Sequence, residues 1–127
     1  MSGIPVVAAV IQRGGRYLLG RRPVHKRHGG LWEFPGGKLD EDESPADAAH
    51  RELEEELSLS VTRVAAALHT VQDPGSPFAI HFHPVSVRGE PVALEHEEVG
   101  WFTLKELQGM ALAPADERFV RWLLQRG

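Results

Sequence analysis

The sequence predicts a mixed α/β fold in a single domain that covers residues 1–127. Three observations lead to this prediction. Short runs rich in Val, Ile and Phe lie on both sides of a strongly amphipathic segment, a second amphipathic segment closes the chain, and 127 residues are enough for one compact core. Strands around one central helix, with another helix at the end, indicate an α/β or α+β sandwich.

Composition argues against several classes of protein. A net charge of -4 and a pI near 6.0 are unlike the strongly basic balance of a dedicated nucleic-acid binder. The absence of cysteine excludes disulfides, thiolate metal sites and cysteine nucleophiles. There is no apolar run long enough to span a bilayer and no basic leader at the N-terminus. We therefore expect a cytoplasmic protein with neither a nucleic acid nor a membrane as its direct partner.

The first elements are expected to be extended. Residues 4–12 and 16–21 are β-prone and meet at a Gly-Gly pair, which predicts a hairpin. A loop with a basic cluster follows over residues 23–30. Residues 31–34 form a short strand candidate, which the Pro-Gly-Gly of residues 35–37 is expected to break.

The central helix has the clearest signals in the chain. Ser44 is a good N-cap, Pro45 suits the first helical position, and Asp47 lies three residues after the cap. The helix is expected to run to about Leu57, with an apolar stripe facing the core. The stripe consists of Ala46, Ala49, Leu53 and Leu57.

The second half of the chain predicts more strands and two helices. The β-prone runs cover residues 60–71, 78–87 and 99–102, with a turn at residues 73–77. His81 and His83 are expected to be partly exposed on one strand face. Thr103 can cap a short helix over residues 104–107, and Pro114 opens the final helix.

The central helix carries an unusual cluster of acidic residues. Glu52, Glu55 and Glu56 project side by side because they are three and four residues apart, and Arg51 is the only base nearby in the helix. A solvated acidic face is the simplest explanation. A Gly-Gly loop with Lys38 precedes the helix, however, and such a loop suits phosphates, while Mg²⁺ and Mn²⁺ prefer carboxylate oxygens. Together they favour a metal site for phosphate chemistry.

The same residues resemble the Nudix box. The match comprises Gly37, Glu43, the run of residues 51–56 and Leu59, and the one departure is Ser58, where the pattern has Gly. Residues 32–38, Glu95 with His96, and residues 112–116 are similar to MutT-like enzymes, including bacterial CTP pyrophosphohydrolases. The resemblance implies a Nudix fold, an α/β/α sandwich with a mixed central sheet. We expect Ser58 to strain the turn after the helix modestly, without displacing the carboxylates.

The resemblance also implies an activity and a site. The activity is Mg²⁺-dependent hydrolysis of nucleoside triphosphates, oxidised or modified ones included, to the monophosphate and pyrophosphate, with Mn²⁺ as a substitute metal. The protein would be a monomer or a homodimer. The implied metal site consists of Gly36, Glu52, Glu55, Glu56 and Glu95. The implied catalytic residues are Glu52 as the first candidate for the base, Glu95 as the second, and Arg51 to orient the carboxylates. The other implied roles are phosphate binding by Gly37 and Lys38, base contacts by Arg22 and Asp116, and support of the loop by Glu43.

Several alternatives stay open at this point. Asp116 could simply cap the last helix. As a base contact, an ionised Asp accepts hydrogen bonds only, which favours a cytosine or mixed preference. The substrate could instead be a nucleotide sugar or a dinucleoside polyphosphate. A non-catalytic nucleotide sensor is disfavoured, because the chain retains every carboxylate of the Nudix box.

The helix offers a matched pair of variants. Glu55→Gln should lower kcat by at least about a hundredfold with folding intact, because it removes a carboxylate from the expected metal site. Glu54 points away from that face, so Glu54→Gln should retain full activity. Steady-state kinetics beside a thermal melt checks both variants. An active Glu55→Gln enzyme would show that the carboxylate patch is not the metal site.

Overall fold

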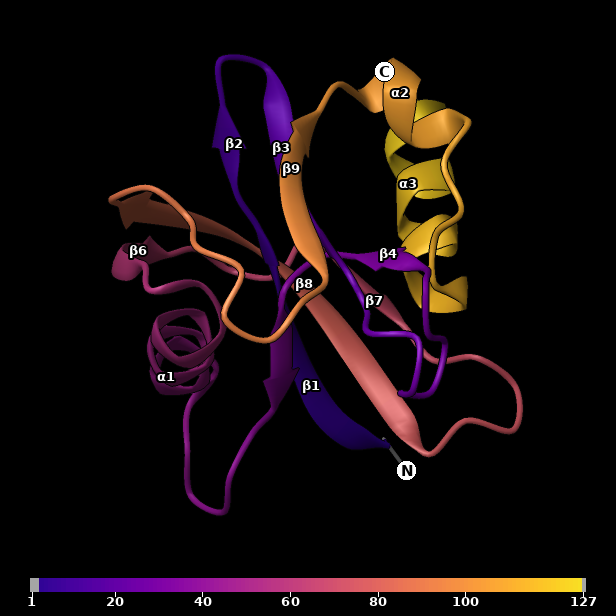
Figure 1. Cartoon of the computed structure of the whole chain (residues 1–127). Coiled ribbons are helices and arrows are strands. Elements are labelled where there is room, and N and C mark those ends of the chain that lie inside the picture. The colour runs from indigo at the N-terminus through magenta and orange to yellow at the C-terminus, as the bar shows by residue number, and fades with distance from the viewer. Residues whose placement is uncertain (1–2, 127) are drawn as a thin grey trace.

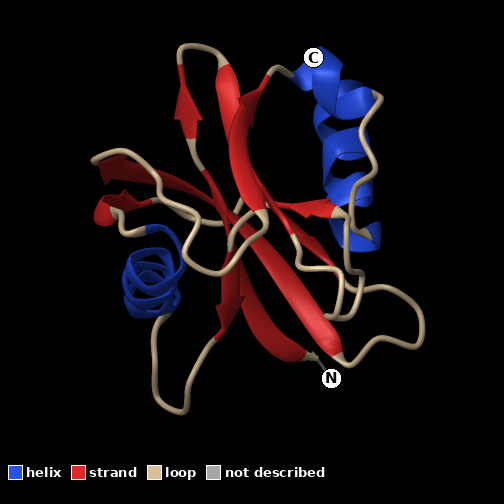
Figure 2. Cartoon of the chain, viewed as in Figure 1, coloured by secondary structure: helices blue, strands red, loops and turns tan. Residues whose placement is uncertain are grey.

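The computed structural model describes residues 3–126 and contains a mixed sheet between helices (Figure 1). The strands are β1 (Ile4–Val10), β2 (Gln12–Arg13), β3 (Arg16–Arg21), β4 (Trp32–Glu33), β5 (Gly36–Lys38), β6 (Ser60–Val64), β7 (His69–Val71), β8 (Phe78–Arg88) and β9 (Glu98–Phe102). The helices are α1 (Pro45–Leu57), α2 (Leu104–Gln108) and α3 (Pro114–Arg126). Figure 2 shows how the strands separate α1 from the other two helices.

The strands form two sheets, one of five strands and one of four. In the larger sheet the order is β5-β1-β8-β6, and β7 pairs with the same long strand, β8. β1 and β8 run parallel, from Ile4 opposite Phe78 to Val10 opposite Pro84, whereas the other pairs are antiparallel. In the smaller sheet the order is β2-β3-β4, with β9 on the free side of β3. The mixed central sheet is therefore confirmed.

Strand β1 joins the layers because its side chains alternate between two cores. Val7 and Ala9 pack in the clusters on the α1 side, whereas Ala8 and Val10 pack in the cluster that holds α3. Successive strand residues point to opposite faces of a sheet, so one apolar strand serves both cores. The result is the α/β/α sandwich that the sequence predicted.

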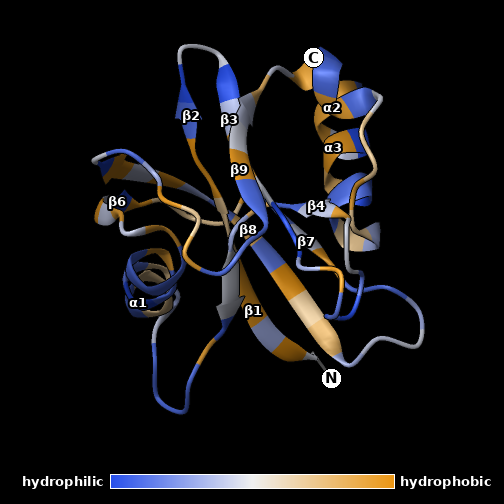
Figure 3. Ribbon diagram, viewed as in Figure 1, coloured by the Kyte–Doolittle hydropathy of each residue, from blue (hydrophilic) through white to orange (hydrophobic). Residues whose placement is uncertain are grey.

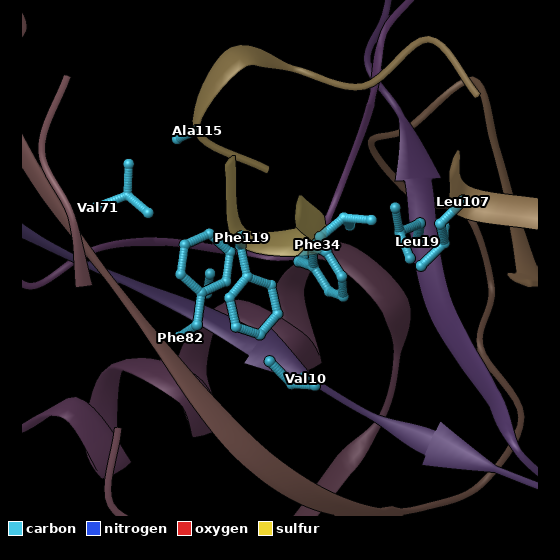
Figure 4. Close-up of a cluster of buried hydrophobic side chains, with 10 residues drawn as sticks. Val10, Leu19, Phe34, Val71, Phe82, Leu107, Ala115 and Phe119 are labelled. Carbon is cyan, nitrogen blue, oxygen red and sulfur yellow. The ribbon is translucent and has the colours of Figure 1, made fainter. Parts of the chain in front are cut away.

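In the core on the α3 side, aromatic rings pack among aliphatic side chains (Figure 4). Phe82 of β8 stacks on Phe119 of α3 with ring centroids 4.1 Å apart and an interplanar angle of 7°. Phe34 meets both rings edge-on, at 5.8 Å from Phe82 and 5.3 Å from Phe119. Since Phe34 directly follows β4, this packing anchors the segment that leads into β5.

The predicted first hairpin is only partly correct. The Gly14–Gly15 turn joins β2 to β3, and both glycines have positive φ, as this tight turn requires. β1 ends at Val10 and pairs with β5 and β8 in the other sheet. The continuous β-prone run of residues 4–12 predicts one hairpin arm, because local sequence does not show that β1 and β2 pair with different strands.

Other expected elements also need correction. Gly36–Lys38 is a strand, β5, paired with β1, and not a break. Residues 60–71 divide into β6 and β7, which pair with different halves of β8. His83 is buried and its Nδ1 lies 2.9 Å from the carbonyl oxygen of Ala65, so it is not an exposed strand residue.

Helix α1 begins and ends as predicted. The Ser44 hydroxyl accepts a hydrogen bond from the amide of Asp47 at 3.1 Å. Ala49, Leu53 and Leu57 are buried, whereas Ala46 is only half-buried, and Ala48 is buried in its place. The predicted capping of α2 by Thr103 is also present, as a full capping box with Glu106.

Ser58 ends α1 in the left-handed conformation, with φ 58° and ψ 34°. Its amide donates to the carbonyl oxygen of Glu54 at 3.1 Å, and the next amide, of Leu59, donates to Leu53 at 3.2 Å. Serine thus occupies a conformation that normally favours glycine, while the last turn of the helix keeps its hydrogen bonds.

Within the described residues, the helices are all too short or too polar to cross a membrane.

Ser58→Gly should raise the free energy of unfolding by up to about 1 kcal/mol, because it removes the steric cost of a side chain at positive φ. Denaturant unfolding monitored by circular dichroism measures the change. Ser60→Gly is the matched control, since Ser60 is exposed in the extended strand β6 and glycine there should be destabilising. A loss of stability in Ser58→Gly would contradict the strain argument.

Candidate active site

The loop from β5 to α1 approaches the acidic helix closely at two glycines. A side chain on Gly37 would collide with the Glu52 carboxylate, so a larger residue would displace this carboxylate from the strand. Gly36 has φ 153°, and a side chain there would collide with the carbonyl oxygen of Val7 on β1. The Gly-Gly pair therefore lets β5 fit between β1 and the carboxylates of α1.

Arg51 connects this loop to the helix. Its guanidinium donates to both carboxylate oxygens of Glu43, from Nε at 2.9 Å and from Nη2 at 2.8 Å. Nη2 also donates to the carbonyl oxygen of Lys38 at 3.1 Å. On the helix, Nη1 donates to Glu52 at 3.0 Å and to Glu55 at 3.2 Å. The planar, many-donor fork of arginine suits this arrangement, for which lysine would supply too few donors.

Glu43 is held as an anion by these contacts. The hydrogen bonds from Arg51 lower the pKa of Glu43 to about 2, and the amide of Asp40, which donates to it at 2.8 Å, acts in the same direction. The pKa of Arg51 is raised in turn, chiefly by its hydrogen bond to Glu43. These hydrogen bonds join the loop to the helix.

Glu56 is the most unusual acidic residue of the helix. Its carboxyl is buried, with one oxygen lacking a hydrogen-bond partner among the described residues. Burial raises its pKa to about 9, and a hydrogen bond with Glu52 and the nearby charges of Glu52, Glu33 and Glu95 add to the increase. An unpartnered buried carboxyl beside other carboxylates is expensive without a cation. The donor set therefore fits a hard divalent metal.

The three box carboxylates are not equally placed. Glu56 faces the interior, Glu52 is half-buried, and Glu55 is exposed. Glu52 and Glu55 both turn towards Arg51, and within residues 3–126 no three acidic or histidine side chains are grouped as a metal-binding set. Arg51 is the cation that balances them in this arrangement, so a bound metal would compete with it for the same oxygens.

A cavity of about 610 Å³ opens in front of the buried carboxyl. Its walls are contributed by β1, β5, the loop after β3, the loop between β7 and β8, and the start of α3. Much of the loop that joins β5 to α1 beside it is hydrophilic (Figure 3). Seven of the residues predicted for the site line the cavity: Arg22, Gly36, Gly37, Lys38, Glu56, Glu95 and Asp116. Glu43, Arg51, Glu52 and Glu55 lie outside the lining, along α1 and its loop.

Asp116 lines the cavity from the first turn of α3. Its Oδ1 accepts a hydrogen bond from the amide of Phe34 at 2.9 Å, and the residue is 7% exposed. Residues 111–113 bring it there, since Trp32 exchanges backbone hydrogen bonds of 2.9 Å with Ala111 and Ala113. Burial raises the pKa of Asp116 to about 8. Asp116 therefore ties α3 to the β4–β5 segment rather than serving only as a helix cap.

Sequence reasoning missed a half-buried carboxylate whose charge acts on Asp116. Glu33 accepts a hydrogen bond from Arg22 Nη1 at 2.9 Å on one oxygen and lies 3.0 Å from His96 Nε2 on the other. Both Glu33 and His96 line the cavity. The available signal was a single charged residue inside the apolar run L-W-E-F, which is unusual unless the charge has a partner.

Comparison with known proteins identifies the family. The NUDIX domain matches residues 1–123. The chain is 42% identical over 119 residues to CTP pyrophosphohydrolase of Escherichia coli, an alignment that covers 91% of this chain and 87% of the relative. This chain belongs to the Nudix hydrolase family.

Other Nudix relatives cover the chain equally well. It is 31% identical over 126 residues to 8-oxo-dGTP diphosphatase of Haemophilus influenzae, covering 95% of this chain and 91% of that one. The crystal structure of the MutT NUDIX hydrolase from Burkholderia pseudomallei superimposes with a TM-score of 0.83 and 31% identity, over 95% of this chain and 98% of that one. The predicted Nudix fold and MutT-like membership are confirmed.

The raised pKa of Asp116 predicts a pH dependence of stability. The carboxyl takes up its proton more readily in the folded state, so its contribution is complete below the unfolded pKa of 3.8 and is lost as pH rises through about 8. Relative to Asp116→Asn, the wild-type free energy of unfolding should therefore decline across this window. Denaturant titrations of both proteins between pH 4 and pH 9, roughly spanning the two pKa values, measure the difference. A difference that stays constant with pH would show that Asp116 titrates normally.

Proposed function

We propose that this Nudix hydrolase is a Mg²⁺-dependent pyrophosphohydrolase of nucleoside triphosphates, with a preference for cytosine. The observation that carries the proposal is the cavity of about 610 Å³. Its lining includes Lys38 with the glycines of β5, here called the phosphate end, and Glu33 with Asp116 and Arg22, here called the base end. Ligand sites for small molecules usually have volumes of about 300–1,000 Å³, which accommodates one nucleotide. The activities named for the relatives from Escherichia coli and Haemophilus influenzae support the same substrate class.

The phosphate end is formed by β5 and the helix behind it. Lys38 and the glycines of β5 line the cavity together with Glu56 and Glu95. Lys38 is exposed, and its Nζ lies 5.6 Å from the centroid of the Phe78 ring on the neighbouring wall. A flexible ammonium at the rim suits the charge of a triphosphate, and the glycines allow its close approach.

The base end is formed by Glu33, Asp116 and Arg22. A carboxylate such as that of Glu33 accepts hydrogen bonds and donates none. Cytosine presents its N4 amino group as a donor, whereas uracil presents a carbonyl oxygen at the same position. The Glu33 carboxylate therefore favours cytosine over uracil, and it also admits the amino groups of purines.

A divalent metal fits the carboxylates of α1. Glu52, Glu55 and Glu56, with Glu95 and the carbonyl oxygen of Gly36, are the groups that would hold it, and the unpartnered oxygen of Glu56 is the observation that supports this set. When bound, Mg²⁺ or Mn²⁺ would neutralise phosphate charge and lower the pKa of a bound water.

The remaining chemistry belongs to the side chains. Glu52 is the first candidate to accept the proton of the attacking water, because it lies against Gly37 and its carboxylate is oriented by Arg51 at 3.0 Å. Glu95 is the second candidate, as an exposed carboxylate that lines the cavity and whose charge acts on Glu56. Arg51 holds Glu52 in place, and Glu43 holds Arg51.

A substrate panel tests the proposal. CTP and dCTP should be hydrolysed to the monophosphate and pyrophosphate, with a kcat/KM at least about tenfold above that of UTP and dTTP. ATP, GTP, 8-oxo-dGTP, a nucleotide sugar and a dinucleoside polyphosphate complete the panel. Separate assays for pyrophosphate and phosphate identify the bond that is cleaved.

Two controls make the panel decisive. A chelator should abolish turnover, and Mg²⁺ or Mn²⁺ should restore it, whereas Ca²⁺ should restore little because its coordination is larger and less regular. Hydrolysis of the nucleotide sugar or the dinucleoside polyphosphate, without hydrolysis of any triphosphate, would overturn the proposed substrate class. Turnover that survives complete removal of metal would overturn the metal dependence.

A further inference from the structure

The carboxylate of Glu33 is held from both sides at the base end of the cavity. Arg22 Nη1 donates to Oε1 at 2.9 Å, and His96 Nε2 donates to Oε2 at 3.0 Å. Each carboxylate oxygen has two lone pairs, so each one retains an acceptor site for a ligand. The two donors fix the plane of the carboxylate and hence the direction of those remaining lone pairs.

His96 reaches Glu33 through a specific packing arrangement. The two residues are 63 positions apart, and His96 lies just before β9, which pairs with β3. The amide of Glu97 donates to the carbonyl oxygen of Arg21 at 2.9 Å and holds this segment against β3. A side chain on Gly20 of β3 would lie 2.6 Å from the imidazole ring, so the ring occupies space that only glycine leaves free.

The hydrogen-bonding pattern indicates which ring nitrogen of His96 carries the proton. Its side chain is 5% exposed, and Nδ1 lacks a hydrogen-bond partner within the described part of the chain. A proton on Nδ1 would be buried without an acceptor, whereas a proton on Nε2 points at a carboxylate oxygen. The geometry therefore assigns the ring proton to Nε2, and His96 serves as a donor to Glu33 alone.

We propose that His96 is a positioning residue that sets nucleobase preference by orienting the Glu33 carboxylate. This inference rests on the proposed base end of the cavity and deepens it. Without His96, Glu33 is paired with Arg22 only, and its carboxylate is free to rotate about its last side-chain bond. The acceptor sites then lose their fixed direction, and discrimination between an amino group and a carbonyl oxygen on the base declines.

The test is a binding measurement that needs no turnover. The ligands are CMP, UMP and ribose 5-phosphate, titrated by calorimetry into the full chain and its variants. The wild type should bind CMP more tightly than UMP. In His96→Leu the ratio of the two affinities should fall by about tenfold, as expected for one charge-assisted hydrogen bond, while affinity for ribose 5-phosphate is unchanged.

Two further variants separate positioning from mere folding. His96→Gln keeps an amide donor near the place of Nε2 and should restore most of the preference. Gly20→Ala leaves the imidazole in the chain but forces the ring to shift, so it should lower the preference in the same direction as His96→Leu. If His96→Leu does not fold, these two variants carry the test.

His83→Leu is the matched control. His83 is also a buried histidine, with 9% exposure, but it does not line the cavity, so the preference for CMP should be retained in this variant. An unchanged ratio in His96→Leu and Gly20→Ala would overturn the inference. So would an equal loss of affinity for all three ligands accompanied by a lower melting temperature, because that pattern indicates a structural role.

The outcomes for the wild type distinguish this inference from the proposed function. A protein that prefers CMP in binding and hydrolyses no triphosphate would overturn the proposed function, while the role of His96 would still be measured. A protein that hydrolyses triphosphates and binds CMP and UMP equally would overturn the role of His96 and the cytosine preference, and would leave the proposed triphosphate hydrolysis in place.

Discussion

The fork formed by Arg51 is the interaction on which the site depends. One guanidinium joins the loop, through Glu43 and the carbonyl oxygen of Lys38, to the helix, through Glu52 and Glu55. Without it, the glutamates of α1 would repel one another, and the β5–α1 loop would lose the hydrogen bonds that join Glu43 and Lys38 to the helix. The carboxylates stay close because a single cation, rigid and always charged, is shared among them.

A second connection orders the wall of the cavity that contains Asp116. The amide of Phe34 donates to Asp116, and Trp32 exchanges backbone hydrogen bonds with Ala111 and Ala113. Phe34, Phe82 and Phe119 pack together in the core. This packing holds both the Phe34 amide and the helix that carries Asp116, so this part of the cavity wall is as rigid as the core. The carboxylates of α1 are therefore held by electrostatic interactions, whereas the position of Asp116 depends on the packing of the aromatic core.

Prediction from the sequence succeeded where the signals are local. Ser44 with Pro45 and Asp47 marked the start of α1, and the run of glutamates marked the acidic face, because capping and helix periodicity involve residues at most a few positions apart. β5 was missed because Gly36 and Gly37 are poor strand formers, and only pairing with β1 makes them extended. The burial of His83 was missed because covering by another segment is not visible in the strand itself.

The sequence by itself determined the family, the acidic helix and most of the residues expected to meet the phosphates, since these residues fall within one continuous segment whose spacing is dictated by helix geometry. The tertiary structure alone decided how Glu56 differs from Glu55, because burial depends on the layer that covers a residue and not on its neighbours in the chain. Only the tertiary structure brings Glu33 and His96 together, although they are 63 positions apart in the sequence. The imidazole ring of His96 occupies the space next to Gly20, where a side chain would collide with it. Contacts of this kind arise from the pairing of β3 with β9, which no local pattern specifies.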